Sequence, residues 1–301
     1  MNPNDSILQR ALSLGFSHCG FAKAEKLESL RPFYTNFIKQ KKNAGLTYLK
    51  RYTEQRLNPD LLLPGIKSVI TLMMNYYPQE IIPEEDNYVI SKYAYGKDDH
   101  IVVKERVEKL AFFITESFKP SLVKSFFDSG PVSEKIWAQR CGVGWQGKNT
   151  LIINRKGGSF YHIGIILTDL NLYPDEPETD RCGSCDKCIN ACPTGALNSP
   201  YQLEIARCIS YQTIENRGEI PQEIKGNLRD RIFGCDICQD VCPFNRFAKP
   251  TKEKHFLPSP ELTALRKKEW REMGEETFNR IFRDSGIIRT GYQTVKRNMG
   301  L

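Results

Sequence analysis

Two closely spaced runs of cysteine constrain this chain more than any other feature. The first run, CGSCDKCINACPTGAL, contains Cys182, Cys185, Cys188 and Cys192, followed by Pro193. The second, CDICQDVCPFN, repeats the spacing with Cys235, Cys238, Cys242 and Pro243. The second run is one cysteine short, because Ile232 stands where the pattern requires the first sulfur. Such a loop brings three thiolates to one point, so the local fold must form around what they bind.

The spacing Cys-x2-Cys-x2-Cys-x3-Cys-Pro is that of bacterial ferredoxins, which bind cubane iron–sulfur clusters. Structural zinc is the main alternative, but zinc sites usually pair two separate Cys-x2-Cys loops or combine cysteine with histidine. The chain has four histidines, and none of them form a pair with metal-ligand spacing. The pattern therefore predicts two [4Fe–4S] clusters.

Cys208 lies between the two runs and can provide the ligand that the second run lacks. In two-cluster ferredoxins the last cysteine of a run binds the other cluster. We therefore expect one cluster to bind Cys182, Cys185, Cys188 and Cys242. We expect the other to bind Cys192, Cys208, Cys235 and Cys238. Cys19 and Cys141 remain, and we interpret both as small buried residues.

The chain as a whole has 301 residues, enough for one large domain and a small one. Its net charge of +7 fits an ordinary solvated surface or a polyanionic partner such as RNA. No apolar run approaches the roughly 18 residues of a membrane span, and the N-terminus lacks a secretory signal. We therefore expect a cytoplasmic protein without a membrane partner, in which clustered cysteines bind metal or do redox work.

Before the cysteine runs, apolar patterns predict helices and strands in irregular alternation. Helical spacing covers residues 5–14, with Asp5 or Ser6 as the cap, and residues 98–118. NTLIIN and SFYHIGIILTDL predict two strands joined by RKGG, a hairpin-like turn. This alternation indicates an α/β or α+β layer structure, and we expect the fold class to be α+β. The expected parts are a catalytic domain over 1–172, a ferredoxin-like two-cluster module over 173–250 and a tail of two or three short basic helices over 251–301.

Two neighbouring clusters form a route for electrons, so the residues before them must hold the site that uses those electrons. That part of the chain has no GxGxxG motif after a strand and no Walker lysine loop. It also lacks the DxHxxG motif of corrinoid proteins that bind cobalt through a histidine. A Rossmann nicotinamide or flavin site is therefore unsupported.

From about residue 5 to 297, the chain resembles the epoxyqueuosine reductases. The resemblance rests on DSGPVSEKIWAQRCGVGWQGKNTLIIN, GSFYHIGIILTDL and the cysteine runs, with EQRLNPDLLLPGIKSVITL and YAYGKDDH before them. It implies a nitroreductase-like domain that binds base-off cobalamin. It implies that cob(I)alamin, supplied with electrons by two [4Fe–4S] clusters and an external low-potential donor, reduces epoxyqueuosine in tRNA to queuosine. Longer members continue into C-terminal helical repeats that help to hold tRNA, whereas this chain ends at RTGYQTVKRNMGL.

The resemblance also implies roles for single residues. Asp128, in FFDSGP, would be the proton donor, although an aspartate before Ser-Gly-Pro more often caps a turn or helix. The implied cobalamin contacts are Arg56, Ser91, Asp128, Ile152, Ile163, Ser210 and Asp236, with Lys148 and Asn149 helping to shape the pocket. For RNA we expect the basic tail to contribute Lys267, Lys268 and Arg271.

Two other functions stay open. The architecturally related reductive dehalogenases act on small molecules, and they usually carry a twin-arginine export signal that this N-terminus lacks. A non-catalytic electron carrier would not need the long segment before the clusters. The basic charge favours tRNA, and we expect a monomer.

Overall fold

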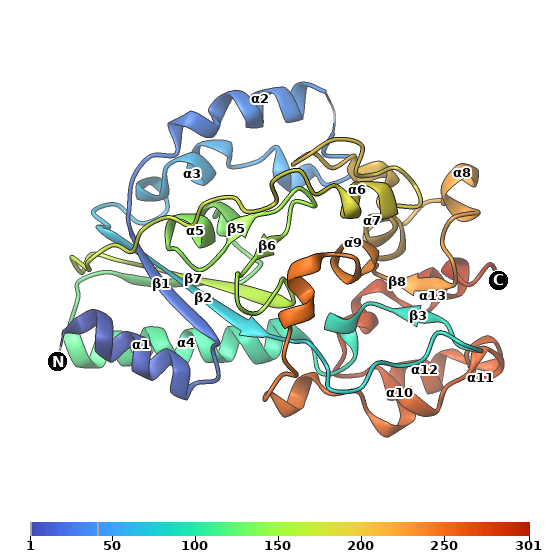
Figure 1. Ribbon diagram of the computed structural model, residues 1–301. Helices are drawn as coiled ribbons and strands as arrows, with labels where there is room; N and C mark the ends of the chain where they lie inside the picture. Colours follow the sequence, from blue (N-terminus) through green and yellow to red (C-terminus); the bar gives the residue numbers. More distant parts are fainter. Residues whose placement is uncertain (1, 41) are drawn as a thin grey trace.

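The computed structural model describes residues 2–40 and 42–301 and shows a mixed helix-and-sheet fold (Figure 1). A four-stranded antiparallel sheet with the order β1-β2-β7-β4 forms its first part. The strands are β1 (His18–Lys23), β2 (Ser68–Asn75), β4 (Val123–Phe126) and β7 (Tyr161–Thr168). β2 and β7 pair over their full length, from Ser68 opposite Thr168 to Asn75 opposite Tyr161. Both are rich in apolar, β-branched residues, which suits the two buried centre strands of the sheet.

Helices cover both faces of this sheet (Figure 1). On one face α1 (Pro3–Ser13) and α4 (Asp99–Phe118) bury an apolar stripe in the main core. On the other face α5 (Glu134–Arg140) packs with Trp137 fully buried. Gly164 on β7 allows α4 to approach closely, because a Cβ there would lie 2.5 Å from the Val107 side chain. This packing fixes the ends of β4 and β7 relative to the start of α4.

The cysteine runs and the C-terminal residues form the other side of the molecule (Figure 1). The cysteine-bearing part contains α6 (Lys187–Ala191), α7 (Ile209–Ile214), α8 (Gln222–Lys225), β8 (Arg231–Phe233) and α9 (Ile237–Asp240). β8 pairs in parallel with β3 (Val89–Ile90). The C-terminal helices are α10 (Pro260–Ala264), α11 (Lys267–Glu272), α12 (Glu275–Ile281) and α13 (Tyr292–Asn298). They surround a second core in which Trp270, Phe278 and Phe282 pack with Tyr88 and Phe233.

Short elements complete the chain. Two α-helices, α2 (Arg31–Lys39) and α3 (Thr53–Leu57), follow β1, and β5 (Trp145–Gln146) pairs with β6 (Ile152–Ile153). The 3-10 helices are Glu28–Leu30, Thr47–Leu49, Pro59–Leu61, Lys92–Ala94, Ile205–Arg207, Pro243–Phe247, Lys254–Phe256 and Gly286–Thr290. Within the described residues, no helix combines the length and the apolar character needed to cross a lipid bilayer.

Three expectations about local structure are wrong. Helix α1 begins at Pro3, and its cap is Asn2, whose side chain accepts a hydrogen bond from the amide of Asn4, rather than Asp5 or Ser6. The two strands around RKGG do not form one hairpin, because β6 pairs with β5 while β7 joins the central sheet. The C-terminal part has four α-helices instead of two or three. Each helix is short, and the buried aromatic residues of the second core come from more than one of them.

Candidate active site and cluster sites

Four cysteines surround a small cavity of about 80 Å³ in the cysteine-bearing part. They are Cys182, Cys185, Cys188 and Cys242, the set that the spacing predicts for one cluster. The ammonium group of Lys148 fastens the first loop here, because Nζ donates to the carbonyl oxygens of Gly183 at 2.6 Å and Cys185 at 2.9 Å. Lys148 therefore shapes this cluster loop directly.

The other four cysteines lie on the wall of a much larger cavity of about 550 Å³. They are Cys192, Cys208, Cys235 and Cys238. Cys208 is the N-cap residue of α7, and it lies on this wall together with Cys235 and Cys238 of the second run. The side-chain amide of Asn149 donates to the carbonyl of Cys238 at 3.3 Å and joins this wall to the segment before β6. The structure thus gathers the eight cysteines into the two predicted sets, while their ligation of metal stays a prediction.

The surroundings of the sulfurs suit iron–sulfur clusters. Burial raises the pKa of the Cys208 thiol, and hydrogen bonds from the backbone N–H groups of Tyr211 and Ser210 lower it. The indole Nε1 of Trp145 is buried without a hydrogen-bond partner among the described residues, and the indole lowers the pKa of the nearby Cys182 thiol against the larger, raising effect of burial. N–H donors directed at cysteine sulfurs are one means by which proteins tune such clusters. The residues present therefore fit the two clusters.

The large cavity lies between the central sheet and the cysteine-bearing part. β7 contributes Tyr161, His162 and Ile163 to one side, and α7 contributes Ile209, Ser210 and Tyr211 to another. Its volume falls in the usual range for sites that bind a cofactor or small molecule. The second cysteine set is part of its wall, so a cluster there would border directly on anything bound inside.

Five of the expected cobalamin contacts line this cavity. They are Ser91, Asp128, Ile163, Ser210 and Asp236. Ile152 does not line it and instead packs in a small core cluster with Met73, Ala138 and Val143. Arg56 is also absent from the lining; its Nη1 lies 3.5 Å from the carbonyl oxygen of Val132.

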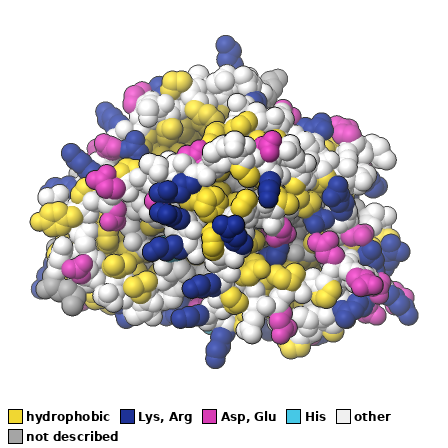
Figure 2. Space-filling model, viewed as in Figure 1, with side chains coloured by type: hydrophobic (Ala, Val, Ile, Leu, Met, Phe, Trp, Pro, Cys, Tyr) yellow, Lys and Arg dark blue, Asp and Glu magenta, His cyan; other side chains and the backbone are white. Residues whose placement is uncertain are grey.

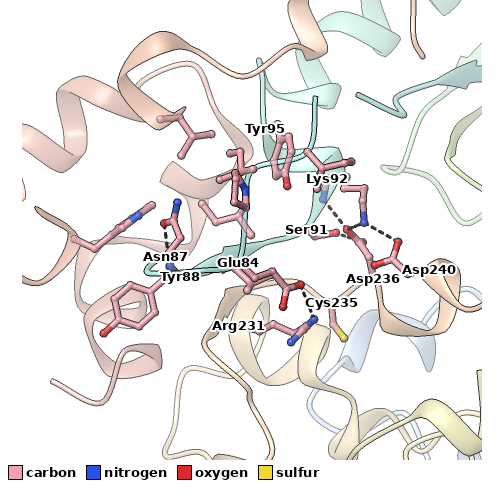
Figure 3. A pocket seen from close by; sticks show the side chains of 17 residues that line it. Glu84, Asn87, Tyr88, Ser91, Lys92, Tyr95, Arg231, Cys235, Asp236 and Asp240 are labelled. Atoms are coloured by element: carbon pink, nitrogen blue, oxygen red, sulfur yellow. Dashed lines mark hydrogen bonds and ion pairs between the residues drawn. The ribbon is translucent and has the colours of Figure 1, made fainter. Parts of the chain in front are cut away.

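Asp236 joins the second cysteine loop to the residues that follow β3 (Figure 3). Its carboxylate accepts hydrogen bonds from the hydroxyl of Ser91 and from the backbone N–H of Lys92, the latter at 2.7 Å. Lys92 Nζ lies 3.6 Å from Asp236 and 2.7 Å from Asp240. Figure 3 shows a separate cavity that these residues also border. Its volume is about 30 Å³, which is too small for a cofactor. Asp236 is buried and paired, so it positions the loop between Cys235 and Cys238.

Asp128 presents its carboxyl group at the large cavity. It follows β4 with φ of +47°, a left-handed conformation that is uncommon for residues other than glycine and often marks functional sites. Its Oδ2 lies 3.2 Å from Nε2 of His100. Among the described residues, no backbone N–H donates to this carboxylate, so the structure shows no capping role for it. The side chain is 64% exposed, which leaves it accessible to a substrate.

Sequence reasoning did not single out two groups beside Asp128. Glu134, at the start of α5, accepts a hydrogen bond of 2.9 Å from the Asp128 amide. Burial, followed by the charge of Asp128, raises the pKa of Glu134 to about 7. His100 lies in the first turn of α4. The only available signals were the runs KDDH and DSGPVSEK, which lie in the segments that carry the family resemblance.

The residues expected to bind RNA lie elsewhere. Lys267 forms an ion pair of 2.8 Å with Asp230, and Arg271 Nε donates to the hydroxyl of Tyr88 at 2.9 Å. The large cavity is not lined by Lys267, Arg271 or the exposed Lys268. Figure 2 shows Lys and Arg side chains spread over one face of the molecule, several of them near its middle. The basic charge is therefore distributed rather than confined to the C-terminal helices.

Two sets of four cysteines, one of which lines the large cavity, are typical of an iron–sulfur oxidoreductase. Comparison with known proteins specifies the family. A family described as "4Fe-4S double cluster binding domain" matches residues 181–245, and one described as "Epoxyqueuosine reductase QueG, DUF1730" matches residues 56–129. The chain belongs to the epoxyqueuosine reductase family, and its cofactors include two [4Fe–4S] clusters.

Relatives and solved structures support this membership over nearly the full length. The chain is 45% identical to the epoxyqueuosine reductase of Cellulophaga algicola, over 98% of this chain and 96% of the relative. It is 36% identical to the epoxyqueuosine reductase of Escherichia coli, over 98% of this chain and 79% of the relative. A crystal structure of epoxyqueuosine reductase with an epoxyqueuosine-modified tRNA-Tyr stem loop matches with a TM-score of 0.91 and 30% identity. The match covers 98% of this chain and 79% of the chain in that structure. A Bacillus subtilis structure, in which an aspartate-bearing catalytic loop is swung out of the active site, matches with a TM-score of 0.85 and 30% identity, over 98% and 79%.

Proposed function

We propose that this chain reduces the epoxide of epoxyqueuosine in tRNA and so forms queuosine. The observation that carries the proposal is the large cavity, which has Cys192, Cys208, Cys235 and Cys238 on one wall and Asp128 on another. An electron source and a proton donor would therefore face the same space. The similarity to a structure that holds an epoxyqueuosine-modified stem loop supports the choice of substrate.

We infer that the cavity holds base-off cobalamin within a nitroreductase-like domain. Ile163 offers an apolar surface to a flat ring, while the hydroxyl groups of Ser91 and Ser210 can bind its amide substituents. Two histidines line the cavity: His162 packs between the rings of Tyr76 and Phe256, and His100 contacts Asp128. Binding without a histidine ligand to cobalt therefore rests on the family resemblance. When bound, cobalamin would supply the strongly reducing chemistry that breaks the epoxide, and the protein would orient it and supply protons.

Side chains at the cavity would supply the proton and hold its donor in position. Asp128 would donate a proton from its carboxyl group to the epoxide oxygen as a C–O bond breaks. Glu134 holds the backbone of Asp128 through the 2.9 Å hydrogen bond from its amide. Lys135 Nζ donates to the carbonyl of Thr150 at 3.0 Å, and both residues line the cavity beside Glu134. The bond to Glu134 would keep Asp128 facing the space that the substrate would enter.

The modified base must reach this cavity from an RNA loop. Tyr48 is 53% exposed and lies close enough to Asp128 and Glu134 for their charges to raise its pKa, after the larger effect of burial. Exposed aromatic rings next to a cavity suit the stacking of unpaired bases. The phosphates would be bound by basic residues, among which Lys267, Lys268 and Arg271 remain our candidates. We propose that the enzyme acts as a cytoplasmic monomer that receives electrons from an external low-potential donor.

The test is to load the purified protein with iron, sulfide and cobalamin without oxygen and to supply a low-potential reductant. The corrin absorbance of the protein after gel filtration measures cobalamin binding. An epoxyqueuosine-containing stem loop and a halogenated phenol are then offered in parallel. Formation of queuosine from the RNA, with the phenol untouched, is the expected result. Consumption of the phenol alone would favour the reductive dehalogenase alternative, and absence of bound corrin would remove cobalamin from the account.

A further inference from the structure

The reduction of an epoxide to an alkene consumes two electrons and two protons. Both C–O bonds break, the electron pair remains as the second bond of the alkene, and both protons leave on the oxygen as water. Asp128 carries one proton at a time, so its carboxylate must be reprotonated before the second C–O bond breaks. If the proposed function holds, a second group must therefore return a proton to Asp128 within each turnover.

His100 is the group placed to deliver that proton. Its Nε2 lies 3.2 Å from Oδ2 of Asp128. The ring packs edge-on against Phe127, the residue before Asp128, with their centroids 5.5 Å apart. The side chain is 33% exposed, so the ring reaches both the catalytic carboxylate and water.

The opposite edge of the His100 ring is held by two carboxylates. Nδ1 lies 3.3 Å from Oδ1 of Asp98 and 3.5 Å from Oδ1 of Asp99. Asp98 also caps α4, because its side chain accepts a hydrogen bond of 3.0 Å from the backbone N–H of His100. Asp98 fixes both the start of the helix and the imidazole that the helix presents.

Each of these carboxylates is anchored by a partner from a distant part of the chain. Arg289 Nη1 lies 2.8 Å from Oδ2 of Asp98, and it also contacts Nδ1 of His100. Oδ2 of Asp99 lies 3.4 Å from Nδ1 of the buried His162, a residue of β7. The charged and titratable groups around His100 are therefore three carboxylates, one guanidinium group and one buried imidazole.

We propose that His100 is a positioning and proton-carrying residue that reprotonates Asp128 within each turnover. Its Nε2–H donates to Oδ2 of Asp128, and the ring regains a proton from solvent through its exposed edge. Asp98 and Asp99 keep the imidazole aligned during both transfers. Hydrogen bonding to Asp128, and then to Asp98 and Asp99, raises the pKa of His100, while partial burial of the ring opposes this. The net effect keeps the ring protonated at neutral pH.

One experiment measures the coupling of the two groups without turnover. The four histidines are labelled with 13C in the cluster-loaded protein, and the pKa of His100 is measured by NMR in the wild type and in Asp128→Asn. Removal of the Asp128 charge should lower the pKa of His100 measurably, while the spectra of the exposed His255 serve as the internal control and should be the same in the two proteins. Equal His100 pKa values in the two proteins would overturn the inference, whatever the substrate proves to be.

A second experiment measures the proton-carrying role. His100→Gln keeps a hydrogen-bond donor and His100→Ala leaves room for free imidazole, and neither side chain can carry the proton. Both variants should lose turnover about 100-fold or more, since acid–base groups typically contribute 100- to 10,000-fold. Added imidazole should raise the turnover of His100→Ala at least tenfold, in proportion to the fraction of the imidazole that is protonated. The control His255→Gln should behave as wild type.

The outcomes separate this inference from the proposed function. Iron and corrin content are measured in every variant, so that a loss of cofactor is not taken for a loss of proton transfer. A wild type that makes no queuosine under these conditions would contradict the proposed function, and the NMR comparison would still decide the coupling. An active wild type with a His100→Gln variant within about threefold of it, or a His100→Ala variant that imidazole does not rescue, would contradict the proton-carrying role.

Discussion

The backbone N–H of Asp128 donates a hydrogen bond of 2.9 Å to Oε1 of Glu134, six residues further along the chain. This bond joins the turn after β4 to the first turn of α5 and holds Asp128 at φ of +47°. Both residues line the large cavity, so this contact fixes the turn that carries Asp128 at the edge of that cavity.

Glu134 should make stability depend on pH. Its pKa is raised from 4.5 to about 7 in the folded protein, so the folded state keeps this proton more tightly than the unfolded state. The stability contribution is fully present below pH 4.5 and is lost as the pH rises through about 7. Relative to Glu134→Gln, the wild type should therefore lose on the order of 1–3 kcal/mol between pH 4.5 and 7.5.

Thermal unfolding of the anaerobic, cluster-loaded protein at several pH values measures this difference. Glu134→Gln is the matched variant, because it keeps the acceptor oxygen for the Asp128 amide and removes only the ionisation. A constant difference in midpoint between the two proteins across this pH range would show that Glu134 titrates normally.

Cys208→Ser should damage one cluster and leave the other. Cys208 lines the large cavity with Cys192, Cys235 and Cys238, whereas the other four cysteines surround a separate cavity. Iron content should fall from about eight to about four atoms per chain, with the remaining EPR signal that of a single cluster. Cys19→Ser is the control, since Cys19 lines neither cavity, and it should keep its full iron content. Unchanged iron in Cys208→Ser would refute the crossed assignment.

The sequence predicts best what depends on local spacing. The seven cysteines of the two runs, with Cys208 between them, can be sorted from spacing alone into two sets of four, and the folded chain gathers these sets at two cavities. Long-range pairing is harder: RKGG indicates a hairpin, yet β7 pairs with β2, more than eighty residues away in the chain. His100 was missed for the same reason. Its meaning comes from Asp128 and Arg289, which only the folded chain brings beside it.

Asp128→Asn should separate catalysis from folding. Asparagine has nearly the same size and is tolerated in the left-handed backbone conformation, but it cannot donate a carboxyl proton. The variant should bind cobalamin and both clusters normally and react about 100-fold or more slowly. Single-turnover rates with reduced, fully loaded enzyme provide the measurement. A rate within about threefold of wild type would assign proton donation to water or another group.

Charge reversal on α11 tests the predicted RNA contacts. Lys267→Glu, Lys268→Glu and Arg271→Glu together should weaken stem-loop binding and reduce its dependence on salt, because phosphate contacts release counterions. Lys267 and Arg271 also contact Asp230 and Tyr88, so iron and corrin content must be shown to be intact. The same reversal at Lys104, Lys109 and Arg283, which are exposed on other helices or turns, controls for net charge. Equal weakening by both triple variants would mean that α11 has no specific role.

The most direct test of the whole account is a single-turnover reaction of the reduced, cobalamin- and cluster-loaded protein with an epoxyqueuosine-containing tRNA stem loop. Nucleosides are quantified by mass spectrometry, and the electrons consumed are counted from the oxidation of a titrated reductant. We expect one queuosine to form for every two electrons consumed, with no product when cobalamin is omitted. Recovery of the epoxyqueuosine unchanged, with both clusters reduced and corrin bound, would contradict it.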